Sequence, residues 1–311
     1  MNHPSKIVIA TRKSALAMWQ ARHTAARLKK LYPDVITELL GMTTEGDRKL
    51  DTPLAALGGK GLFIKELEVA LETGRADIAV HSMKDVPMNL PAGFNIAAIS
   101  EREDPRDALV SNHYRDLESM PAGSVVGTSS LRRETQLRAR CRHLRVEPLR
   151  GNVQTRLRLL DEGRYAGIIL AAAGLKRLGL SSRITLILEP AYSLPAVGQG
   201  ALGIECRAER KDMMDLLTPL NHADTRWCVE AERAFSRALA GSCTVPLGGF
   251  AEISGTNVRL RGFVGSIDGS CLLFEELTWP RSGVPEELGS AVAQRLIARG
   301  ARDILAGAQV S

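Results

Sequence analysis

A lysine and an aspartate stand side by side where a buried strand is predicted to end. The run Asp77-Ile-Ala-Val-His-Ser-Met-Lys-Asp-Val-Pro87 begins with apolar residues 78–80, which predict a buried strand, and reaches Lys84 and Asp85 just before its proline. Ligands of open α/β sheets bind outside the carboxyl ends of the strands, so this pair is a candidate for chemistry. The run taken alone favours a simpler interpretation, in which Asp85 only begins the turn that Pro87 completes.

Arginines gather at other strand ends of the chain. Five of them lie in, or one turn beyond, a predicted strand-to-helix turn: Arg12, Arg132, Arg133, Arg150 and Arg156. Free N–H groups and the helix dipole favour anions at such turns, so a cation there indicates a bound anion. A guanidinium fork fits both oxygens of a carboxylate. We therefore expect the five to converge on one cleft. Four further arginines are expected on solvated helix faces: Arg138, Arg140, Arg142 and Arg158.

Alternating strands and helices position these residues. Helix predictions rest on apolar spacing and end signals, with Ser14 as the N-cap of the first helix. In the first region strands are predicted at residues 6–11, 35–42, 78–80 and 94–99, and helices at 14–31 and 62–73. In the second region strands are predicted at residues 124–127, 144–149, 166–171 and 184–188, and helices at 131–141, 153–161 and 172–178. Such alternation predicts two α/β domains.

The remaining chain predicts a return crossover and a third domain. The glycine-rich run 195–206 leads into an apolar strand, interpreted as the return to the first domain, which a helix at 212–217 completes. A helix from residue 224 or 225 to about 240, strands at 250–253, 258–264 and 271–278, and a helix at 284–299 follow. The predicted fold class is α/β: two periplasmic-binding-protein-like domains around a cleft, plus a small C-terminal α+β domain with a three-stranded antiparallel sheet. The boundaries are 1–100 with 201–220, then 101–200, then 221–311.

Two polar segments are predicted to form a flexible lid and an interdomain hinge. Gly58-Gly-Lys-Gly61 places Lys60 among glycines, and because it lacks the spacing of a P-loop, a flexible lid is the preferred interpretation. The charged run 101–107 is expected to be solvated and to form a hinge between the first two domains.

The five cysteines are odd in number and contain no CxxC pair, which predicts neither a disulfide framework nor a metal site. Cys243 lies in a loop, residues 241–249, between a helix and a strand. Cys206, Cys228 and Cys271 fall within regular elements and are expected to be buried packing residues. Cys141, at a helix end among arginines, is a second candidate for a thiol with a lowered pKa.

Composition excludes several classes of protein. No apolar run approaches the roughly 20 residues that cross a bilayer, and the chain begins without a signal sequence, so a cytoplasmic protein without a membrane association is expected. The net charge is +6, but residues 128–160 alone carry +7, so the basicity is local. That window has no aromatic side chain to stack on bases, and nucleic acid is not an expected partner.

Taken in order, these segments resemble the porphobilinogen deaminase (hydroxymethylbilane synthase) family along nearly the whole chain. The similarity is weakest beyond residue 250. The matching motifs are Ile9-Ala-Thr-Arg-Lys-Ser-Ala-Leu-Ala17, Gly58-Gly-Lys-Gly-Leu-Phe63, His81-Ser-Met-Lys-Asp-Val-Pro87, Glu103-Asp-Pro-Arg-Asp-Ala108, Gly127-Thr-Ser-Ser-Leu-Arg-Arg133, Leu149-Arg-Gly-Asn-Val153, Pro195-Ala-Val-Gly-Gln-Gly200 and the Cys243 loop. One departure is Ala56, where some relatives carry a lysine, which affects only how the lid around Lys60 binds carboxylates.

The resemblance implies a transferase of tetrapyrrole and heme biosynthesis. Four porphobilinogen molecules would be joined head to tail with loss of ammonia, and linear hydroxymethylbilane released by hydrolysis. A dipyrromethane cofactor would be joined to Cys243 by a thioether, and Asp85 would be catalytic. The implied cofactor ligands are Lys84, Asp85, Ser129, Arg132, Arg133 and Arg150, and the implied substrate ligands are Arg12, Ser14, Arg150, Arg156, Gln199 and Gly200.

Residue chemistry fits these implied roles. Porphobilinogen bears an acetate and a propionate, so a pyrrole chain is a polyanion that arginines hold in register. Ammonia loss leaves a cation that a fixed carboxylate such as Asp85 stabilises, with Lys84 keeping that carboxylate ionised. A thiolate at Cys243 is a good nucleophile toward such an electrophile.

A cytosolic two-domain binding protein for small carboxylate anions is the alternative, and Cys243 distinguishes the two, because a binding module needs no loop thiol. No exposed apolar stripe argues for more than a monomer. The product would pass to a downstream tetrapyrrole enzyme.

Overall fold

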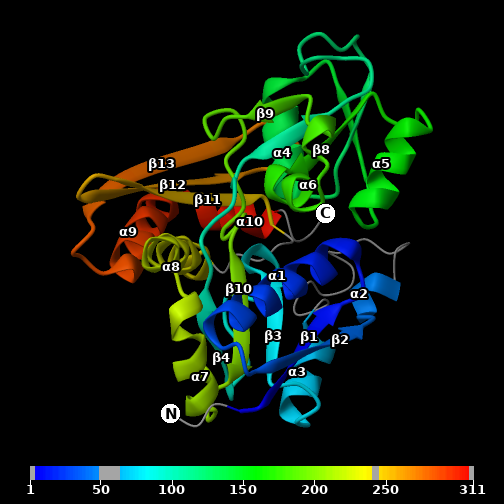
Figure 1. Cartoon of the computed structure of the whole chain (residues 1–311). Coiled ribbons are helices and arrows are strands. Elements are labelled where there is room, and N and C mark those ends of the chain that lie inside the picture. The colour runs from blue at the N-terminus through cyan, green and yellow to red at the C-terminus, as the bar shows by residue number, and fades with distance from the viewer. Residues whose placement is uncertain (1–3, 49–63, 240–244, 308–311) are drawn as a thin grey trace. The chain divides into compact units, whose positions relative to one another are not determined.

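The computed structural model describes residues 4–48, 64–239 and 245–307, so Ala56, Lys60 and Cys243 lie outside the described residues. The chain forms two compact units. Unit 1 comprises Met1–Arg102 and Ala201–Arg226, and unit 2 comprises Glu103–Gly200 and Trp227–Ser311. Figure 1 follows the elements of each unit along the chain.

Unit 1 contains a five-stranded sheet with one antiparallel strand. Its strands are β1 (Lys6–Arg12), β2 (Ile36–Met42), β3 (Ile78–Ser82), β4 (Phe94–Ile99) and β10 (Leu202–Arg207). The order is β2-β1-β3-β10-β4. Strand β1 runs parallel to β2 and β3, and β10 runs antiparallel to β3 and β4. The predicted return of the chain to the first sheet is therefore confirmed.

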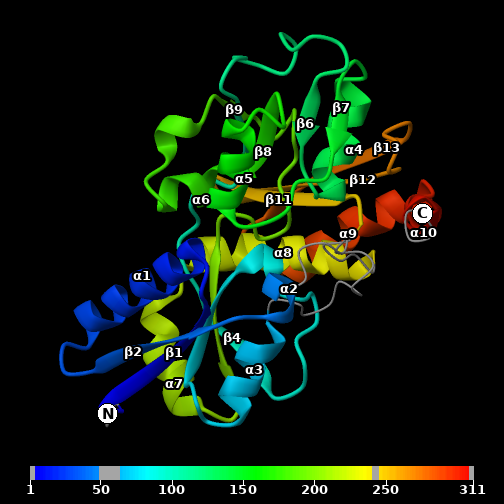
Figure 2. The same cartoon turned by 90° about the vertical axis from the view of Figure 1, so that its right-hand side faces the viewer.

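Helices cover both faces of this sheet because its strands are apolar on both sides. Helices α1 (Ala15–Leu31) and α7 (Lys211–Leu217) share a buried cluster with Ile7 and Ile9, whereas α3 (Lys65–Glu72) packs around Ala10. Alternate residues of β1 thus point to opposite faces, as the pleat requires. Figure 2 shows α1 and α7 on one side of the strands and α3 on the other. A single turn, α2 (Glu45–Arg48), follows β2.

Unit 2 repeats this strand pattern in its first part. Its strands are β5 (Asp107–Val110), β6 (Val125–Gly127), β7 (Arg145–Glu147), β8 (Gly167–Ala171) and β9 (Leu186–Leu188), in the order β7-β6-β8-β5-β9. Strand β6 is parallel to β7 and β8, and β5 is antiparallel to β8 and β9. Helices α5 (Val153–Asp161) and α6 (Ala172–Arg177) share one buried cluster of this sheet, and α4 (Leu131–Arg140) belongs to the other.

The C-terminal part of unit 2 is an antiparallel meander. Its strands are β11 (Leu247–Ser254), β12 (Asn257–Gly265) and β13 (Leu272–Pro280), and its helices are α9 (Pro285–Ala298), α10 (Ala301–Gly307) and α8 (Ala223–Ala238), whose first four residues belong to unit 1. The ring of Phe235 in α8 lies against Gly249 and Gly262 of the sheet. The predicted fold class, two α/β sheets followed by a small three-stranded antiparallel sheet with helices, is confirmed.

One polar segment differs from its prediction. The charged run 101–107 was expected to be solvated, yet Asp107 begins β5 and is fully buried. The Asp104 carboxylate is also largely buried, where it pairs with Arg106 and Lys176. Ion pairing offsets the cost of burying these carboxylates, so the last residue of this charged run can begin a core strand.

Candidate functional site

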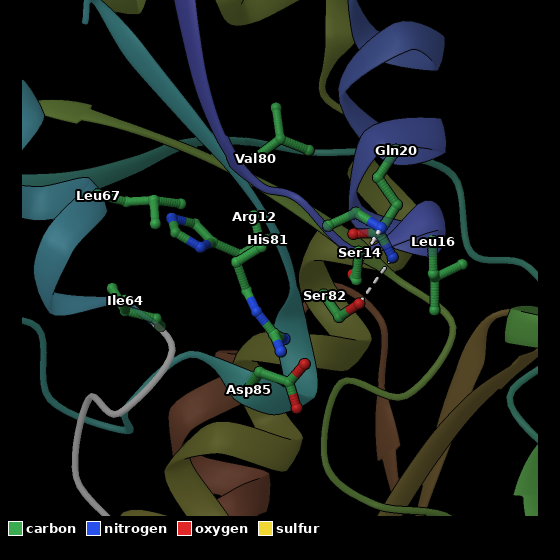
Figure 3. Close-up of a pocket in the computed structure, with 11 residues that line it drawn as sticks. Arg12, Ser14, Leu16, Gln20, Ile64, Leu67, Val80, His81, Ser82 and Asp85 are labelled. Atoms are coloured by element: carbon green, nitrogen blue, oxygen red, sulfur yellow. Dashed lines mark hydrogen bonds between the residues drawn. The ribbon is translucent and has the colours of Figure 1, made fainter. Parts of the chain in front are cut away.

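A pocket opens in unit 1 at the carboxyl ends of β1 and β3. It brings together three of the residues predicted from the sequence, Arg12, Ser14 and Asp85. Its remaining lining residues are Leu16, Ala17, Gln20, Ile64, Leu67, Val80, His81 and Ser82. Figure 3 shows the Arg12 guanidinium and the Asp85 carboxylate directed into the same part of this pocket. Lys84, which precedes Asp85, is half-buried and is not among the lining residues.

Asp85 is held at the pocket by a short turn with an apolar anchor. After β3 the chain makes one turn of 3-10 helix, Met83–Asp85, in which Met83 is buried and its N–H donates to the carbonyl of Ala201 at 3.0 Å. Gly203 faces Met83 across the sheet, and a Cβ there would lie 2.3 Å from the Met83 sulfur. The turn thus fixes the backbone of Asp85, whose side chain remains exposed.

Arg12 and Ser14 are positioned by the end of β1 and the start of α1. Ser14 is the N-cap of α1, and its Oγ accepts from the N–H of Ala17 at 3.3 Å, which confirms the predicted cap. The Arg12 guanidinium donates through Nε to Asp47 at 3.1 Å and pairs with the same carboxylate through Nη2. Burial acts to raise the pKa of Asp47, but the hydrogen bond and charge of Arg12 outweigh it, so that pKa lies below its ordinary value.

The sequence did not reveal a buried acidic cluster beside this pocket. The His81 ring bonds through Nε2 to Glu205 Oε2 at 2.7 Å, although the two residues are far apart in the chain. Glu68 of α3 lies near enough to both to be affected by their charges. Glu205 stands inside an otherwise apolar strand, and a charged residue in such a run is the signal that points to a buried partner.

The arginines at the start of α4 surround a single buried carboxylate in unit 2. Arg132 donates to both oxygens of Asp107, at 2.7 and 3.1 Å, and also to the carbonyl of Leu194. Arg133 donates to Asp107 through Nε and Nη2 and to the carbonyl of Ile169 through Nη1. One anion held by these cations therefore lies within the protein itself, Asp107, and the binding of a ligand carboxylate by the same arginines stays a prediction.

Two further side chains complete the hydrogen bonds of Asp107. Ser193 Oγ donates to one carboxylate oxygen at 2.8 Å, and Gln199 Nε2 donates to the other at 3.0 Å. Gln199, a predicted substrate ligand, is itself buried. Burial acts to raise the pKa of Asp107, but the two guanidinium charges and their hydrogen bonds hold it far below its ordinary value. The carbonyl of Gly200 accepts from Arg177 at 2.6 Å.

Of the other predicted residues of unit 2, Ser129 and Arg150 lie in the loops after β6 and β7, and Arg156 lies in α5. Ser129 Oγ accepts from the N–H of Leu149 and donates to its carbonyl, each at 3.0 Å, which ties the two loops together. Arg150 is half-buried. Arg156, off the apolar face of α5 as predicted, donates through Nε to the carbonyl of Gly151 at 2.8 Å. Because Arg12 belongs to unit 1 and the other four arginines to unit 2, their convergence stays a prediction.

The described cysteines are packing residues. Cys206 and Cys228 are buried as predicted. The prediction for Cys271 is wrong, because this residue precedes β13 and is half-buried. The prediction for Cys141 is wrong: its thiol is buried, and burial raises its pKa, although the sulfur lies 3.1 Å from the Tyr192 hydroxyl. Within residues 4–48, 64–239 and 245–307, no group of three or more His, Cys, Asp or Glu side chains is arranged to hold a metal ion, and no helix has the length and apolarity of a membrane span.

Comparison with known proteins first defines a class. Residues 7–215 match the family model described as "Porphobilinogen deaminase, dipyromethane cofactor binding domain", and residues 227–298 match "Porphobilinogen deaminase, C-terminal domain". The chain is therefore of the class that binds a dipyrromethane cofactor, as predicted.

Relatives narrow the class to one family. The porphobilinogen deaminase of Methylobacillus flagellatus is 64% identical over 306 residues, covering 98% of each chain. That of Nitrosomonas europaea is 64% identical over 307 residues, covering 98% of this chain and 99% of the relative. A solved structure of the methionine-binding protein MetQ is also similar, with 13% identity, a TM-score of 0.45, and coverage of 76% of this chain and 95% of that one. The chain belongs to the porphobilinogen deaminase family.

Proposed function

We propose that this transferase joins four porphobilinogen molecules head to tail with loss of ammonia and then releases linear hydroxymethylbilane by hydrolysis. The observation that carries the proposal is the exposed Asp85 carboxylate, fixed by its turn in a pocket that Arg12 also lines. This pocket offers an acid and a cation at the carboxyl ends of β1 and β3, where an α/β sheet binds ligands. The bound dipyrromethane would supply the pyrrole carbon to which the first substrate is joined.

Asp85 acts as an electrostatic catalyst in this proposal. When the aminomethyl group of porphobilinogen loses ammonia, positive charge develops on the pyrrole, and an ionised carboxylate near the pyrrole N–H stabilises it. The fixed turn at Met83 means that little reorganisation is needed when this charge appears. Lys84, the residue before Asp85, binds a carboxylate of the cofactor in this proposal.

The predicted ligands are proposed to hold the acetate and propionate groups. Those assigned to the cofactor are Lys84, Asp85, Ser129, Arg132, Arg133 and Arg150, and those assigned to the substrate are Arg12, Ser14, Arg150, Arg156, Gln199 and Gly200. Their places at strand ends and helix starts support the assignment. Residues bonded to Asp107 would act through their remaining donors: the Arg132 Nε is buried and has no hydrogen-bond partner among the described residues.

Cys243 is proposed to carry the cofactor through a thioether, and Lys60 to close over the pyrrole chain. The assignment of Cys243 is supported by elimination among the described cysteines, which are buried or half-buried. We further propose three domains, residues 1–100 with 201–220, 101–200 and 221–311, and a cytoplasmic monomer that hands its product to a downstream tetrapyrrole enzyme.

Intact mass combined with turnover of porphobilinogen tests the function. The purified protein should carry an adduct of two pyrrole units and should release ammonia and hydroxymethylbilane. Asp85→Asn should keep the adduct and lose roughly 10²- to 10³-fold in kcat, because one electrostatic contact to the developing charge is lost. Asp34→Asn, which changes an exposed aspartate outside the pocket, is the control.

The cysteine assignment is checked in the same preparation. Cys243→Ser should lack the adduct, and Cys271→Ser should retain it. A wild-type protein without an adduct that consumes no porphobilinogen would favour a binding protein for small carboxylates. Near-normal turnover by Asp85→Asn would refute the role given to Asp85.

A further inference from the structure

Behind the pocket of unit 1 lies a cluster of one imidazole and two carboxylates. The side chains of His81 and Glu205 are 4% and 0% exposed and are joined by the 2.7 Å contact between Nε2 and Oε2. The second oxygen of Glu205 is buried without a hydrogen-bond partner among the described residues, and so is one oxygen of Glu68. Unpartnered buried carboxylate oxygens are costly, so this arrangement is unlike ordinary core packing.

The fold places this cluster between the sheet and α3. Ala79, two residues before His81 in β3, belongs to the buried cluster of α3 and pairs with Glu205 of β10. Because side chains two residues apart share a face of the sheet, His81 points toward α3 as well. Leu67 of α3 lines the pocket beside His81, and Figure 3 shows the imidazole next to that side chain. The imidazole thus has one nitrogen on Glu205 and lies in the wall of the pocket that holds Asp85.

The cluster retains a proton near neutral pH. Burial, and after it the negative charge of Glu205, raise the pKa of Glu68 to about 7 against the opposing effect of His81. Two carboxylates so close in a poorly solvated site cannot easily both be ionised. The charged and titratable groups that face the site are Glu205 on β10, Glu68 on α3, Asp85 on the turn after β3, and Arg12 on β1, whose charge is paired with Asp47.

We propose that His81, oriented by Glu205, is a catalytic base that removes the proton from the pyrrole carbon at which the chain grows. This inference rests on the proposed function and extends it. In each addition the C–N bond of porphobilinogen breaks and its electron pair leaves with ammonia. A C–C bond then forms between the freed methylene carbon and the α-carbon of the chain. The α-carbon must lose its proton to restore the aromatic ring, and the free nitrogen of His81 accepts it and returns it to solvent.

The arrangement matches what a general base requires. A carboxylate bonded to one ring nitrogen fixes the orientation and tautomer of the imidazole and leaves the other nitrogen as the acceptor. It also stabilises the imidazolium that forms, as the buried carboxylate of a catalytic triad does. Asp85 and His81 then have separate tasks in one pocket: the first stabilises the cation before bond formation, and the second takes up the proton afterwards.

His81→Asn and Glu205→Gln test this assignment in the protein that carries its adduct. Each purified variant is checked by intact mass and circular dichroism, and then assayed with porphobilinogen and with porphobilinogen deuterated at its free α-carbon. We expect His81→Asn to lower kcat by roughly 10²- to 10⁴-fold, since proton transfer by a positioned side chain contributes that much. Proton removal should become slower than the other steps, so the deuterium isotope effect should exceed that of the wild type.

The pH profile distinguishes a base from a structural residue. Wild-type kcat should fall as the pH is lowered, because a protonated imidazole cannot accept a proton, and this limb should disappear in His81→Asn. Cys206→Ala is the control. Cys206 follows Glu205 in β10, but its side chain belongs to the buried cluster on the opposite face of the sheet, so this variant should keep the pH profile of the wild type. If His81→Asn does not fold, the isotope effect and pH profile of Glu205→Gln test the role of His81 instead.

Two results would overturn the inference. Variants with an unchanged isotope effect and pH profile would show that the His81–Glu205 pair only supports packing, whatever their loss of stability. If the wild type loads its adduct and turns over porphobilinogen while the variants behave in this way, the proposed function stands and only the role of His81 fails. A wild type that consumes no porphobilinogen refutes both.

Discussion

The Asp107 carboxylate accepts hydrogen bonds from several residues that the sequence predicts to bind a ligand. It receives hydrogen bonds from Arg132, Arg133, Ser193 and Gln199 while being 0% exposed. Two cations near a helix start are unfavourable for the helix dipole, and a buried anion removes that difficulty within the protein itself. Arginine clusters at strand ends therefore indicate an anion, but the pattern does not say whether that anion is a ligand or an aspartate.

Asp107→Asn should destabilise the protein strongly. The substitution leaves two buried guanidinium groups without a counter-charge, which typically costs about 3–5 kcal/mol when one partner of a buried pair is removed. Urea denaturation at pH 7 measures the loss. Asp161→Asn, which breaks an exposed pair with Arg183, should change the free energy of unfolding by about 1 kcal/mol or less. Equal effects of the two substitutions would contradict the account of the network.

The same network predicts the sign of a pH dependence. The pKa of Asp107 is depressed in the folded protein, so its contribution is complete above the unfolded value of about 3.9 and declines as pH falls toward the folded value. The destabilisation caused by Asp107→Asn should accordingly shrink when the denaturation is repeated at decreasing pH below about 4.

Close packing between elements depends on residues whose importance is hard to see in a sequence. Gly289 of α9 lies against α8: a Cβ at this position would be 2.2 Å from the carbonyl oxygen of Ala231 and 2.7 Å from the backbone nitrogen of Phe235. Both neighbouring atoms belong to the backbone, so relief requires one helix to move. The contact between these helices is thus set by the absence of a side chain.

Gly289→Ala should therefore destabilise unit 2 although alanine is the better helix former. Overpacking of this kind typically costs about 1–3 kcal/mol, which exceeds the gain of up to about 1 kcal/mol in helix propensity. Gly307→Ala, where a Cβ meets no atom of the described residues within 4 Å, is the control and should be neutral or slightly stabilising. Thermal unfolding of both variants checks the difference, and a stabilised Gly289→Ala would show that the helices are not in close contact.

Elements with local signals were predictable, whereas partners distant in the chain were not. Helix α5 was predicted with its observed bounds because Val153, Leu157 and Leu160 repeat at helical spacing after the turn at residues 150–152. Strand β5 was missed because it has four residues and begins with a charge. The pairing of His81 with Glu205 follows from β10 lying next to β3, which composition and spacing do not encode. Placement of Asp85 in a pocket with Arg12 followed from the rule for strand ends.

At the scale of the whole molecule, the exposed apolar residues of the described surface bear on the monomer proposed above. The large exposed apolar residues stand on different elements and do not form a stripe along any one of them: Leu31, Ile36, Val69, Leu186, Phe274 and Val284. Single exposed apolar residues are normal for a monomeric protein. Sedimentation equilibrium should give a mass near 33.7 kDa, plus the adduct, at all concentrations. A mass that doubles as concentration rises would overturn the monomer proposal.

Strand β10 has a consequence for the order in which the protein can be completed on the ribosome. It lies between β3 and β4, yet its residues follow the whole segment 103–200 in the chain. A nascent chain that ends at residue 200 already contains β3 and β4 but lacks β10, which hydrogen-bonds to both. The same chain contains all five strands of the second sheet, β5 to β9. Domains fold as units during synthesis. The five-stranded sheet that begins at residue 6 is therefore the later of the two to receive its last strand.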